Sequence, residues 1–289
     1  MLPKRRNRWA VVPLFAVLIA SLSGCTSYEF SRGWLPGVTG VTNHTERIVS
    51  LWAGSWIVLY AVGIIAWGLM FWAIIVYRRR KGDAEIPPQL RYNMPIETLF
   101  TVVPFILVLG FFALTARDIN AIEKPVASDY KIEVVGKQWS WDFNYVNDNV
   151  YDTGIQLQDV TEEAEKELPT LYLPVNRTVE FDLVSRDVIH SFWVIDFLYK
   201  KDVFPGKVNK IYLTPQVIGT YKGKCAELCG EFHSMMLFNV KVVSQEDYDA
   251  RMDELAKMGN VGQLTANPDD PDNINRNNNL PGNKPKSEG

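Results

Sequence analysis

The sequence is poor in cysteine and histidine, and two long stretches of it carry no charge. Only three of its 289 residues are Cys and three are His. This scarcity excludes more than one site built from two thiols and two imidazoles. No Asp, Glu, Lys or Arg occurs over residues 48–77 or over residues 98–116, which excludes an ordinary water-exposed surface for both stretches.

Both uncharged stretches are long enough to cross a membrane. They hold thirty and nineteen residues, and a transmembrane helix needs about 20. Between them lies a basic run from Arg78 to Lys81, and loops rich in Lys and Arg stay on the cytoplasmic side. The sequence therefore predicts a two-helix transmembrane hairpin over residues 48–117, with a cytoplasmic loop at 78–96 and an exported segment, 25–47, before it.

The first 24 residues have the pattern of a signal peptide. Four basic residues precede an apolar run from Trp9 to Leu22, which is too short to cross a bilayer comfortably and ends in small residues. The end of this run together with Ser23-Gly24-Cys25 resembles a bacterial lipobox, in which the cysteine receives a lipid and becomes the mature N-terminus. We therefore expect a lipid anchor at Cys25. The alternative is ordinary signal cleavage nearby, with Cys25 left as an unpaired thiol.

After the second apolar stretch the pattern changes to short runs in which apolar and polar residues alternate. Such runs include residues 131–135, 178–184, 209–213 and 237–243. Several short strands with Gly and Pro between them predict a β-sandwich or barrel, which we place at residues 118–258. Its last part, from Ser244 to Met258, has the signals of a helix. Residues 259–289 hold almost no apolar side chains, so we expect a disordered tail.

The part of the chain that is predicted to be exported is acidic. The formal charge of the whole chain is −3; residues 1–24 carry +4 and residues 78–97 carry +2, so the rest of the chain carries −9. An acidic balance most often marks a solvated surface. In a protein that receives a redox carrier, it would also steer a basic partner toward the site.

A cluster of sulfur and imidazole donors lies near the end of the exported domain. The donors in order are Cys225, Cys229, His233 and Met236. Soft sulfur ligands together with imidazole suit copper, and a distant Met beside Cys and His is a feature of electron-transfer copper sites. A mononuclear blue-copper site needs one Cys and two His, so the second Cys indicates two copper ions bridged by two thiolates.

The second imidazole of such a site would be His190, because His44 lies before the first apolar stretch. Two alternatives use the same residues. Cys225 and Cys229 could form a disulfide, which an exported domain permits, or two thiolates and two imidazoles could bind zinc. The further imidazole and the thioether in the cluster favour copper over both.

This cluster resembles the CuA motif of the cytochrome c oxidase subunit 2 family, and the resemblance extends from about Ile48 to Val243. It implies an α + β membrane protein in which the transmembrane hairpin is followed by an exported cupredoxin-like β-sandwich. It implies that Cys225 and Cys229 bridge two copper ions and that His190 and His233 are the terminal nitrogen ligands. Met236 would be a weak ligand on the copper ion bound by His190, and the backbone carbonyl of Glu227 a weak ligand on the other copper ion. It also implies that the Glu227 side chain binds a magnesium ion at the interface with the catalytic subunit.

Residues 136–145 hold four aromatic side chains, and such dense runs in β-domains most often pack in the core. By the resemblance, the first of them, Trp139, is the residue at which electrons arrive at the copper site. The family often has His at the position of Lys137 and Tyr at that of Ser140, so the chain departs from the common form there while the Trp is retained.

Glu97 stands at the start of the second apolar stretch, on its cytoplasmic side. A carboxylate there can simply complement the helix dipole, and acids at a membrane edge also mark proton routes. The resemblance implies the second role, at the entrance of a proton-uptake channel of the catalytic subunit.

The resemblance implies an electron-transfer subunit of a proton-pumping haem–copper oxidase in the bacterial plasma membrane, with its copper domain on the outer face. Cytochrome c, or a cytochrome c domain of a respiratory complex, would supply electrons to it. Haem in subunit 1 would receive them, and O2 would be reduced in that other subunit. The implied partners are subunit 1, other oxidase subunits, the cytochrome and membrane lipid, and no nucleic acid. A membrane-tethered copper chaperone or thiol oxidoreductase is the alternative, but no thioredoxin-like βαβ pattern surrounds the Cys pair.

The lipobox predicts the form of the mature protein. Mass spectrometry of the mature N-terminus should find residues 1–24 absent and Cys25 lipid-modified, because lipoprotein processing cuts directly before the modified cysteine. An unmodified terminus that starts at another residue would show that the lipobox is accidental.

Overall fold

The structure is a computed structural model that describes residues 26–80, 91–157 and 165–267 and the single residues 17, 82, 89, 159 and 161. Cys25, the predicted signal peptide apart from residue 17, and residues 268–289 lie outside the described residues. The chain divides into two compact units. The first comprises the chain up to Leu35 and residues 49–101, and the second comprises residues 36–48 and the chain from Val102 onward.

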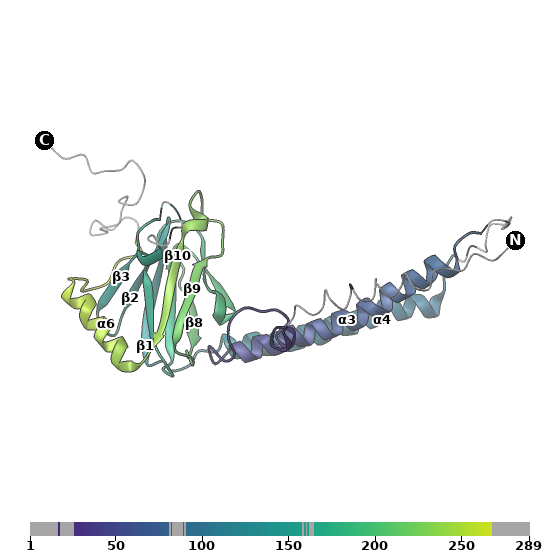
Figure 1. Ribbon diagram of the computed structural model, residues 1–289, viewed down its shortest axis with the longest axis horizontal. Coiled ribbons are helices and arrows are strands. Elements are labelled where there is room, and N and C mark those ends of the chain that lie inside the picture. The colour runs from purple at the N-terminus through teal and green to yellow at the C-terminus, as the bar shows by residue number, and fades with distance from the viewer. Residues whose placement is uncertain are drawn as a thin grey trace. The chain divides into compact units, whose positions relative to one another are not determined.

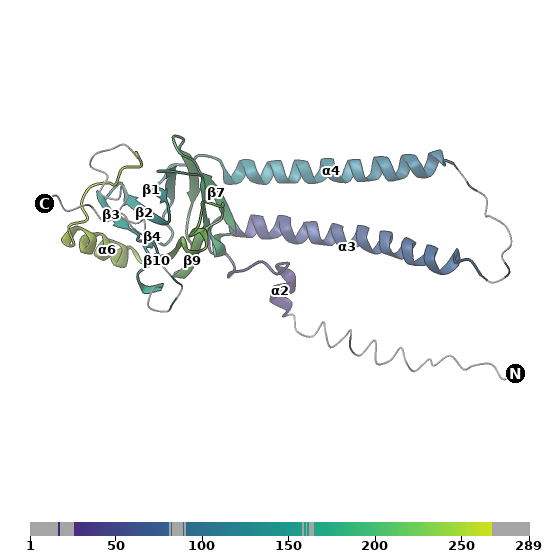
Figure 2. The ribbon, with the colours of Figure 1, turned by 90° about the horizontal axis from the view of Figure 1, so that it is seen from above.

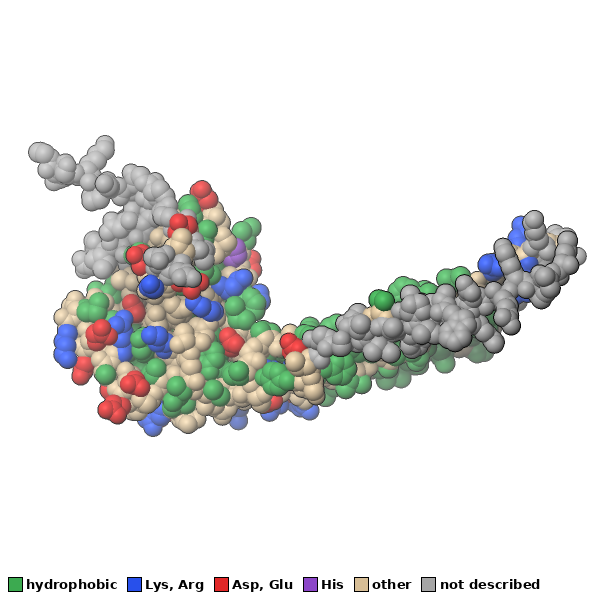
Figure 3. Space-filling view, viewed as in Figure 1, with side chains coloured by type: hydrophobic (Ala, Val, Ile, Leu, Met, Phe, Trp, Pro, Cys, Tyr) green, Lys and Arg blue, Asp and Glu red, His purple; other side chains and the backbone are tan. Residues whose placement is uncertain are grey.

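Two long apolar helices, α3 (Thr45–Val76) and α4 (Met94–Ile122), confirm the predicted pair (Figures 1 and 2). Each is long and apolar enough to cross a membrane. Figure 3 shows a mainly hydrophobic surface over the described helical residues, and side chains such as Ile64 and Ile75 are at least 70% exposed in the isolated chain. Lipid suits this surface, because a helix satisfies its own backbone groups and needs no water along its length.

The short helix α2 (Ser27–Ser31) and the turn after it lie against the first turns of α3. The indole of Trp52 donates a hydrogen bond to the carbonyl of Gly33 at 2.8 Å. Trp34 meets Trp56 edge to face, with ring centroids 6.5 Å apart. Since tryptophan prefers the membrane–water boundary, this aromatic cluster fits the end of α3 that is predicted to face outward.

The second unit contains a β-sandwich of two five-stranded sheets (Figure 1). In order across the first sheet, the strands are β3 (Val150–Thr153), β2 (Ser140–Tyr145), β1 (Tyr130–Lys137), β5 (Val179–Ser185) and β8 (Asn209–Leu213). Across the second they are β4 (Thr170–Pro174), β10 (Leu237–Val243), β9 (Gly219–Cys225), β6 (His190–Val194) and β7 (Tyr199–Val203). Pairing is parallel between β1 and β5 and between β4 and β10, and antiparallel elsewhere. Two apolar helices followed by this sandwich confirm the predicted fold class.

Aromatic side chains fill the space between the sheets. Phe192 stacks on Phe238 with ring centroids 5.0 Å apart, and Trp141 meets both rings edge to face. Gly223 makes room for Phe238, because a Cβ at this position would stand 2.1 Å from the ring. Trp141 and Phe143 are fully buried, so these two members of the aromatic run pack in the core, as such runs usually do.

Charged contacts hold the start of α3 and the end of α4 within the second unit. The buried carboxylate of Asp118 accepts a hydrogen bond from Arg47 at 2.9 Å. Glu123, directly after α4, accepts hydrogen bonds from the Tyr199 hydroxyl and from Lys201, both on β7. The helix ends are therefore tied to each other and to the second sheet.

Helix α6 (Gln245–Lys257) follows the last strand and lies against β3 and β4 (Figure 2). Ser244 caps it by accepting a hydrogen bond from the Asp247 N–H, as the sequence signals predict. Two short 3₁₀ helices, η2 (Ile195–Phe197) and η3 (His233–Met235), complete the described elements.

Residues 260–265 differ from the predicted disordered tail, because they pair with the first sheet. Val261 bridges Val150 on β3. The side chain of Asn144 donates to the carbonyl of Leu264 at 2.8 Å and accepts from its N–H at 2.9 Å. The prediction of disorder rested on the low apolar content of the tail. This segment is ordered by backbone pairing with β3 and by hydrogen bonds to the buried side-chain amide of Asn144 instead.

Candidate metal centre

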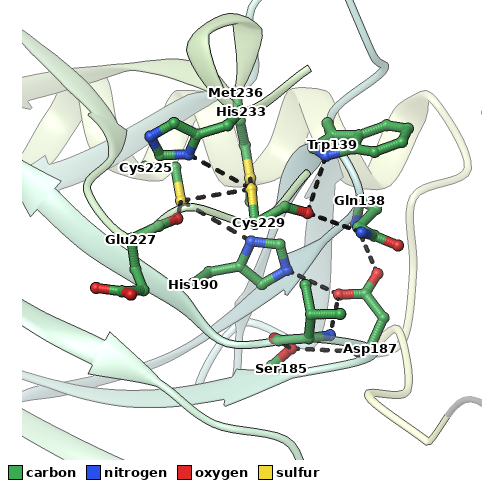
Figure 4. Close-up of polar contacts among 11 residues, drawn as sticks. Gln138, Trp139, Ser185, Asp187, His190, Cys225, Glu227, Cys229, His233 and Met236 are labelled. Atoms are coloured by element: carbon green, nitrogen blue, oxygen red, sulfur yellow. Dashed lines mark hydrogen bonds and ion pairs between the residues drawn. The ribbon is translucent and has the colours of Figure 1, made fainter. Parts of the chain in front are cut away.

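The five predicted side-chain donors converge on one spot (Figure 4). The Sγ atoms of Cys225 and Cys229 lie 3.9 Å apart. His190 Nδ1 lies 3.9 Å from Cys225 Sγ, and His233 Nδ1 lies 3.5 Å from Cys229 Sγ. Met236 Sδ lies 3.8 Å from Cys229 Sγ. Each thiol therefore has an imidazole of its own beside it.

Three strands of the second sheet deliver these donors. Cys225 is the last residue of β9, Met236 directly precedes β10, and His190 is the first residue of β6. The N–H of Cys225 donates to the carbonyl of Met236, and the N–H of Ala226 donates to that of Ser191, both at 3.0 Å. The loop that carries the remaining donors is thus closed at its base and held beside His190.

Both thiols are free and buried. Their sulfur atoms are well beyond the separation of about 2.05 Å that a disulfide requires, so the disulfide alternative does not describe this structure. The hydrogen bond between the two groups lowers the pKa of Cys225 and raises that of Cys229, and burial raises the latter further. The lowered pKa of Cys225 favours its thiolate, which is the form of cysteine that binds metals,.

Asp187 orients the imidazole of His190. Its Oδ1 atom lies 2.7 Å from His190 Nε2, which leaves Nδ1 directed toward Cys225. Burial is the largest single influence on His190 and would lower its pKa, but the hydrogen bonds and charges of Asp187 and Cys225 together outweigh it and raise the pKa. Gly136 lies against the same ring, and a Cβ there would approach its Cδ2 to 3.0 Å. The ring is therefore held from two sides.

The turn between β1 and β2 places Trp139 over the donor loop. Its indole N–H donates to the carbonyl of Cys229 at 3.2 Å, and the Gln138 side chain donates to the same oxygen at 2.8 Å. The Trp139 ring meets Phe232 edge to face at 5.2 Å and is 8% exposed. It also packs on Gly230, whose φ of +126° and missing Cβ allow the close approach,.

The remaining predicted site residues lie apart from this cluster or face outward. The carbonyl oxygen of Glu227 lies 3.2 Å from Cys225 Sγ, while its exposed carboxylate points away from the two sulfurs (Figure 4). Glu97 lies in the first turn of α4, where its carboxylate accepts a hydrogen bond from the Asn93 N–H at 2.7 Å. That contact is a helix cap, and the proton-channel role stays a prediction.

Sequence reasoning missed two residues that support the donors, Asp187 and Gln138. Asp187 stands three residues before His190, and a carboxylate near a candidate metal-binding imidazole is a recognisable signal. Gln138 gave no signal, because its partner is a backbone carbonyl ninety-one residues further along the chain.

The donor set fits copper. Two thiols, two imidazoles and a thioether are soft or intermediate ligands, which copper prefers over the carboxylates and waters that suit magnesium or calcium. Among the described residues, the ligand atoms of His190, Cys225 and Cys229 form a group whose members all lie within 4.8 Å of one another. His233 and Met236 extend that group on the side of Cys229.

The fold and the site define a class of protein, which is a membrane-anchored β-sandwich with a thiolate and imidazole metal centre. A family model described as "Cytochrome C oxidase subunit II, periplasmic domain" matches residues 130–243. A probable cytochrome c oxidase subunit 2 of Streptomyces avermitilis is 44% identical and covers 86% of this chain and 87% of its own length. The cytochrome c oxidase subunit 2 of Mycobacterium tuberculosis is 31% identical, with 85% and 81% covered.

The chain therefore belongs to the cytochrome c oxidase subunit 2 family, as the resemblance in the sequence indicated. Among solved structures, the periplasmic domain of subunit II of the Bradyrhizobium japonicum cytochrome oxidase is similar to it at 27% identity. That likeness covers 46% of this chain and 97% of that one, with a TM-score of 0.43.

Asp187→Ala should weaken metal binding, because His190 would lose the carboxylate that orients its ring. Loss of such a partner typically lowers metal affinity by about 10- to 100-fold. Competition with a chelator for copper measures the effect. Glu231→Ala removes an exposed acid from the donor loop itself and serves as the control. Equal affinities for the two variants would contradict the orienting role.

Proposed function

We propose that this chain is the electron-transfer subunit of cytochrome c oxidase. It accepts electrons from cytochrome c, or from a cytochrome c domain of a respiratory complex, and passes them to haem in subunit 1. O2 reduction and proton pumping take place in the complex. The observation that carries the proposal is the convergence of two free thiols, two imidazoles and a thioether in the exported domain of a subunit 2 family member.

The arrangement of the donors supports two copper ions over one. A single tetrahedral ion needs all of its donors close to one another. His190 lies within 4.8 Å of both sulfurs, but His233 is outside the group that shares this mutual distance. Two ions bridged by Cys225 and Cys229 would give each imidazole its own metal. Met236 and the Glu227 carbonyl would then be the weak ligands of the two ions.

Burial of the thiols argues against the alternative, a copper chaperone or thiol oxidoreductase. Cys225 is 1% exposed and Cys229 is 4% exposed. Thiol exchange requires an attacking sulfur to reach a sulfur of its partner, and neither of these sulfurs is open to a large partner in this conformation.

The protein contributes rigidity to electron transfer. When bound, the copper pair would hold one electron at a time, and the surrounding residues keep its ligands in place. His190 is held by Asp187, and the donor loop is closed by backbone hydrogen bonds at its base. Trp139 lies one hydrogen bond from the backbone of Cys229, which supports its role as the residue where electrons arrive.

The finer features of the proposal follow from the family and the sequence. The copper domain, residues 118–258, would lie on the outer face of the bacterial plasma membrane, held by the hairpin 48–117 and by a lipid at Cys25. The exposed Glu227 carboxylate is available to bind magnesium at the interface with subunit 1. Glu97 would stand at the cytoplasmic entrance of a proton-uptake channel in that subunit.

Metal analysis tests the proposed centre. The exported domain should bind two copper ions and give an EPR signal of a mixed-valence pair shared by both. Cys225→Ser or Cys229→Ser should abolish the centre, because each removes a bridge. Met236→Leu should retain copper and shift its potential, because a weak axial ligand tunes such a site without building it. One copper ion with a blue-copper spectrum, or zinc, would refute the proposal.

Trp139→Gln separates electron uptake from metal binding. Copper content, optical spectrum and docking affinity should stay nearly intact, while uptake from the cytochrome slows by orders of magnitude. Pre-steady-state reduction of the copper centre measures the rate. Trp193→Gln is the matched control, since this partly exposed tryptophan on β6 stacks under Lys224 and has no described contact with a donor.

Removal of exposed acids such as Glu231 should slow the docking of the cytochrome, which the loss of Trp139 should leave nearly intact. Association should slow and depend less on ionic strength, because surface charges act on the encounter and are screened within about 10 Å at 0.1 M salt.

Normal uptake in the Trp139 variant would leave that residue a packing role, and loss of copper would make its role structural.

A further inference from the structure

A buried group of three charges adjoins the segments that carry the donors. Asp142, on β2, is fully buried. One of its oxygens lies 2.7 Å from Lys137 Nζ, and the other accepts a hydrogen bond from Arg186 at 3.0 Å. Lys137 and Arg186 are only 3% and 6% exposed. Charged side chains are almost never buried to this extent unless they are paired.

The first cation, Lys137, is attached to the turn over the metal centre. It ends β1 and is followed directly by Gln138 and Trp139, the two side chains that donate to the carbonyl of Cys229. Its ammonium group also donates to the hydroxyl of Thr153 at 3.2 Å. The side chain of Lys137 therefore fixes the point at which this turn leaves the sheet.

The second cation, Arg186, is attached to the loop that carries His190. It follows β5 and precedes Asp187, the hydrogen-bond partner of the His190 ring. The backbone N–H of Arg186 donates to the carbonyl of Gly136 at 2.9 Å. Asp187 in turn accepts a hydrogen bond from the backbone N–H of Gln138 at 2.6 Å. The turn that carries Trp139 and the loop that carries His190 are thus connected twice. The first connection is the hydrogen bond from Gln138 to Asp187, and the second is the pairing of Lys137 and Arg186 with Asp142.

We propose that Asp142 is a positioning residue for the metal centre. By holding Lys137 and Arg186 together, its carboxylate fixes the turn that carries Trp139 relative to the loop that carries His190. This rests on the proposed function of the site and extends it to a side chain that has no described contact with a donor.

Comparison with the other buried aspartates supports a special role for Asp142. Among the described residues, Asp118 and Asp182 are also buried, but the side chains of the cations that pair with them are at least 42% exposed. Asp142 holds two buried cations, and each of these adjoins a segment of the metal centre.

Asp142→Asn in the full-length chain of the assembled oxidase tests the proposal. The amide keeps the size of the side chain and removes the charge that holds both cations. Copper content should stay the same, while the EPR spectrum and the midpoint potential of the centre change. Electron uptake should fall by about 10- to 100-fold, the range for loss of a residue that supports a metal ligand.

Asp182→Asn is the matched control. Asp182, on β5, is buried and pairs with Lys131 and with Lys210, each at 2.8 Å. None of these three residues adjoins a donor segment, so this variant should lower thermal stability and leave the spectrum, the potential and the uptake rate unchanged. Equal changes in the two variants would reduce the role of Asp142 to general stability and overturn the proposal.

Arg186→Lys provides a second test in case the Asp142→Asn variant does not assemble. Lysine retains the charge but lacks the planar guanidinium that contacts both Asp142 and the Thr265 carbonyl. The same signals should change in the same direction, to a smaller extent. A wild-type protein without a binuclear copper signal would refute the proposed function itself. A wild-type signal that neither variant alters would overturn only the positioning role.

Discussion

The closed base of the donor loop is the constraint on which the metal centre depends. The hydrogen bond from the Cys225 N–H to the Met236 carbonyl joins the end of β9 to the start of β10, and the antiparallel ladder continues from Leu237 to Lys224. Because both ends of the loop are fixed by the sheet, both thiols and the neighbouring imidazole are presented to one small volume. A loop held in this way needs little rearrangement when a metal binds or changes its charge.

The hydrophobic core selects the register that brings in the second imidazole. Phe192 pairs with Cys225 across β6 and β9 and stacks on Phe238 between the sheets. His190 lies two residues before Phe192 and therefore shares its face of the strand. A slip of one residue would turn Phe192 out of the core and His190 away from the thiols. The burial of the Phe192 ring therefore also determines the position of His190.

The donors could be predicted from the sequence because few residues can perform their chemistry. The chain has only three Cys and three His, so the cluster at 225–236 together with His190 was nearly the only possible set of metal ligands. The supporting charges could not be predicted in this way. Arg186 and Asp142 are forty-four residues apart, and each alone resembles an ordinary surface residue. Their pairing depends on the parallel contact between β1 and β5, which no local pattern reveals. The order of residues 260–265 was missed for the same reason, because it depends on the distant Asn144.

Stability alone does not account for the three buried charges. Replacing such a group by apolar residues of similar volume is often neutral or stabilising by about 1–4 kcal/mol, whereas removing one partner costs about 3–5 kcal/mol. Apolar side chains would fill the space beside Asp142 but would give the chain no directional contacts. Hydrogen bonds from Lys137 and Arg186 to one carboxylate define both distance and direction between two loops. A fold that required only stability would gain little from this arrangement, whereas a site that must keep its ligands fixed through repeated electron transfer gains the geometry on which its rate depends.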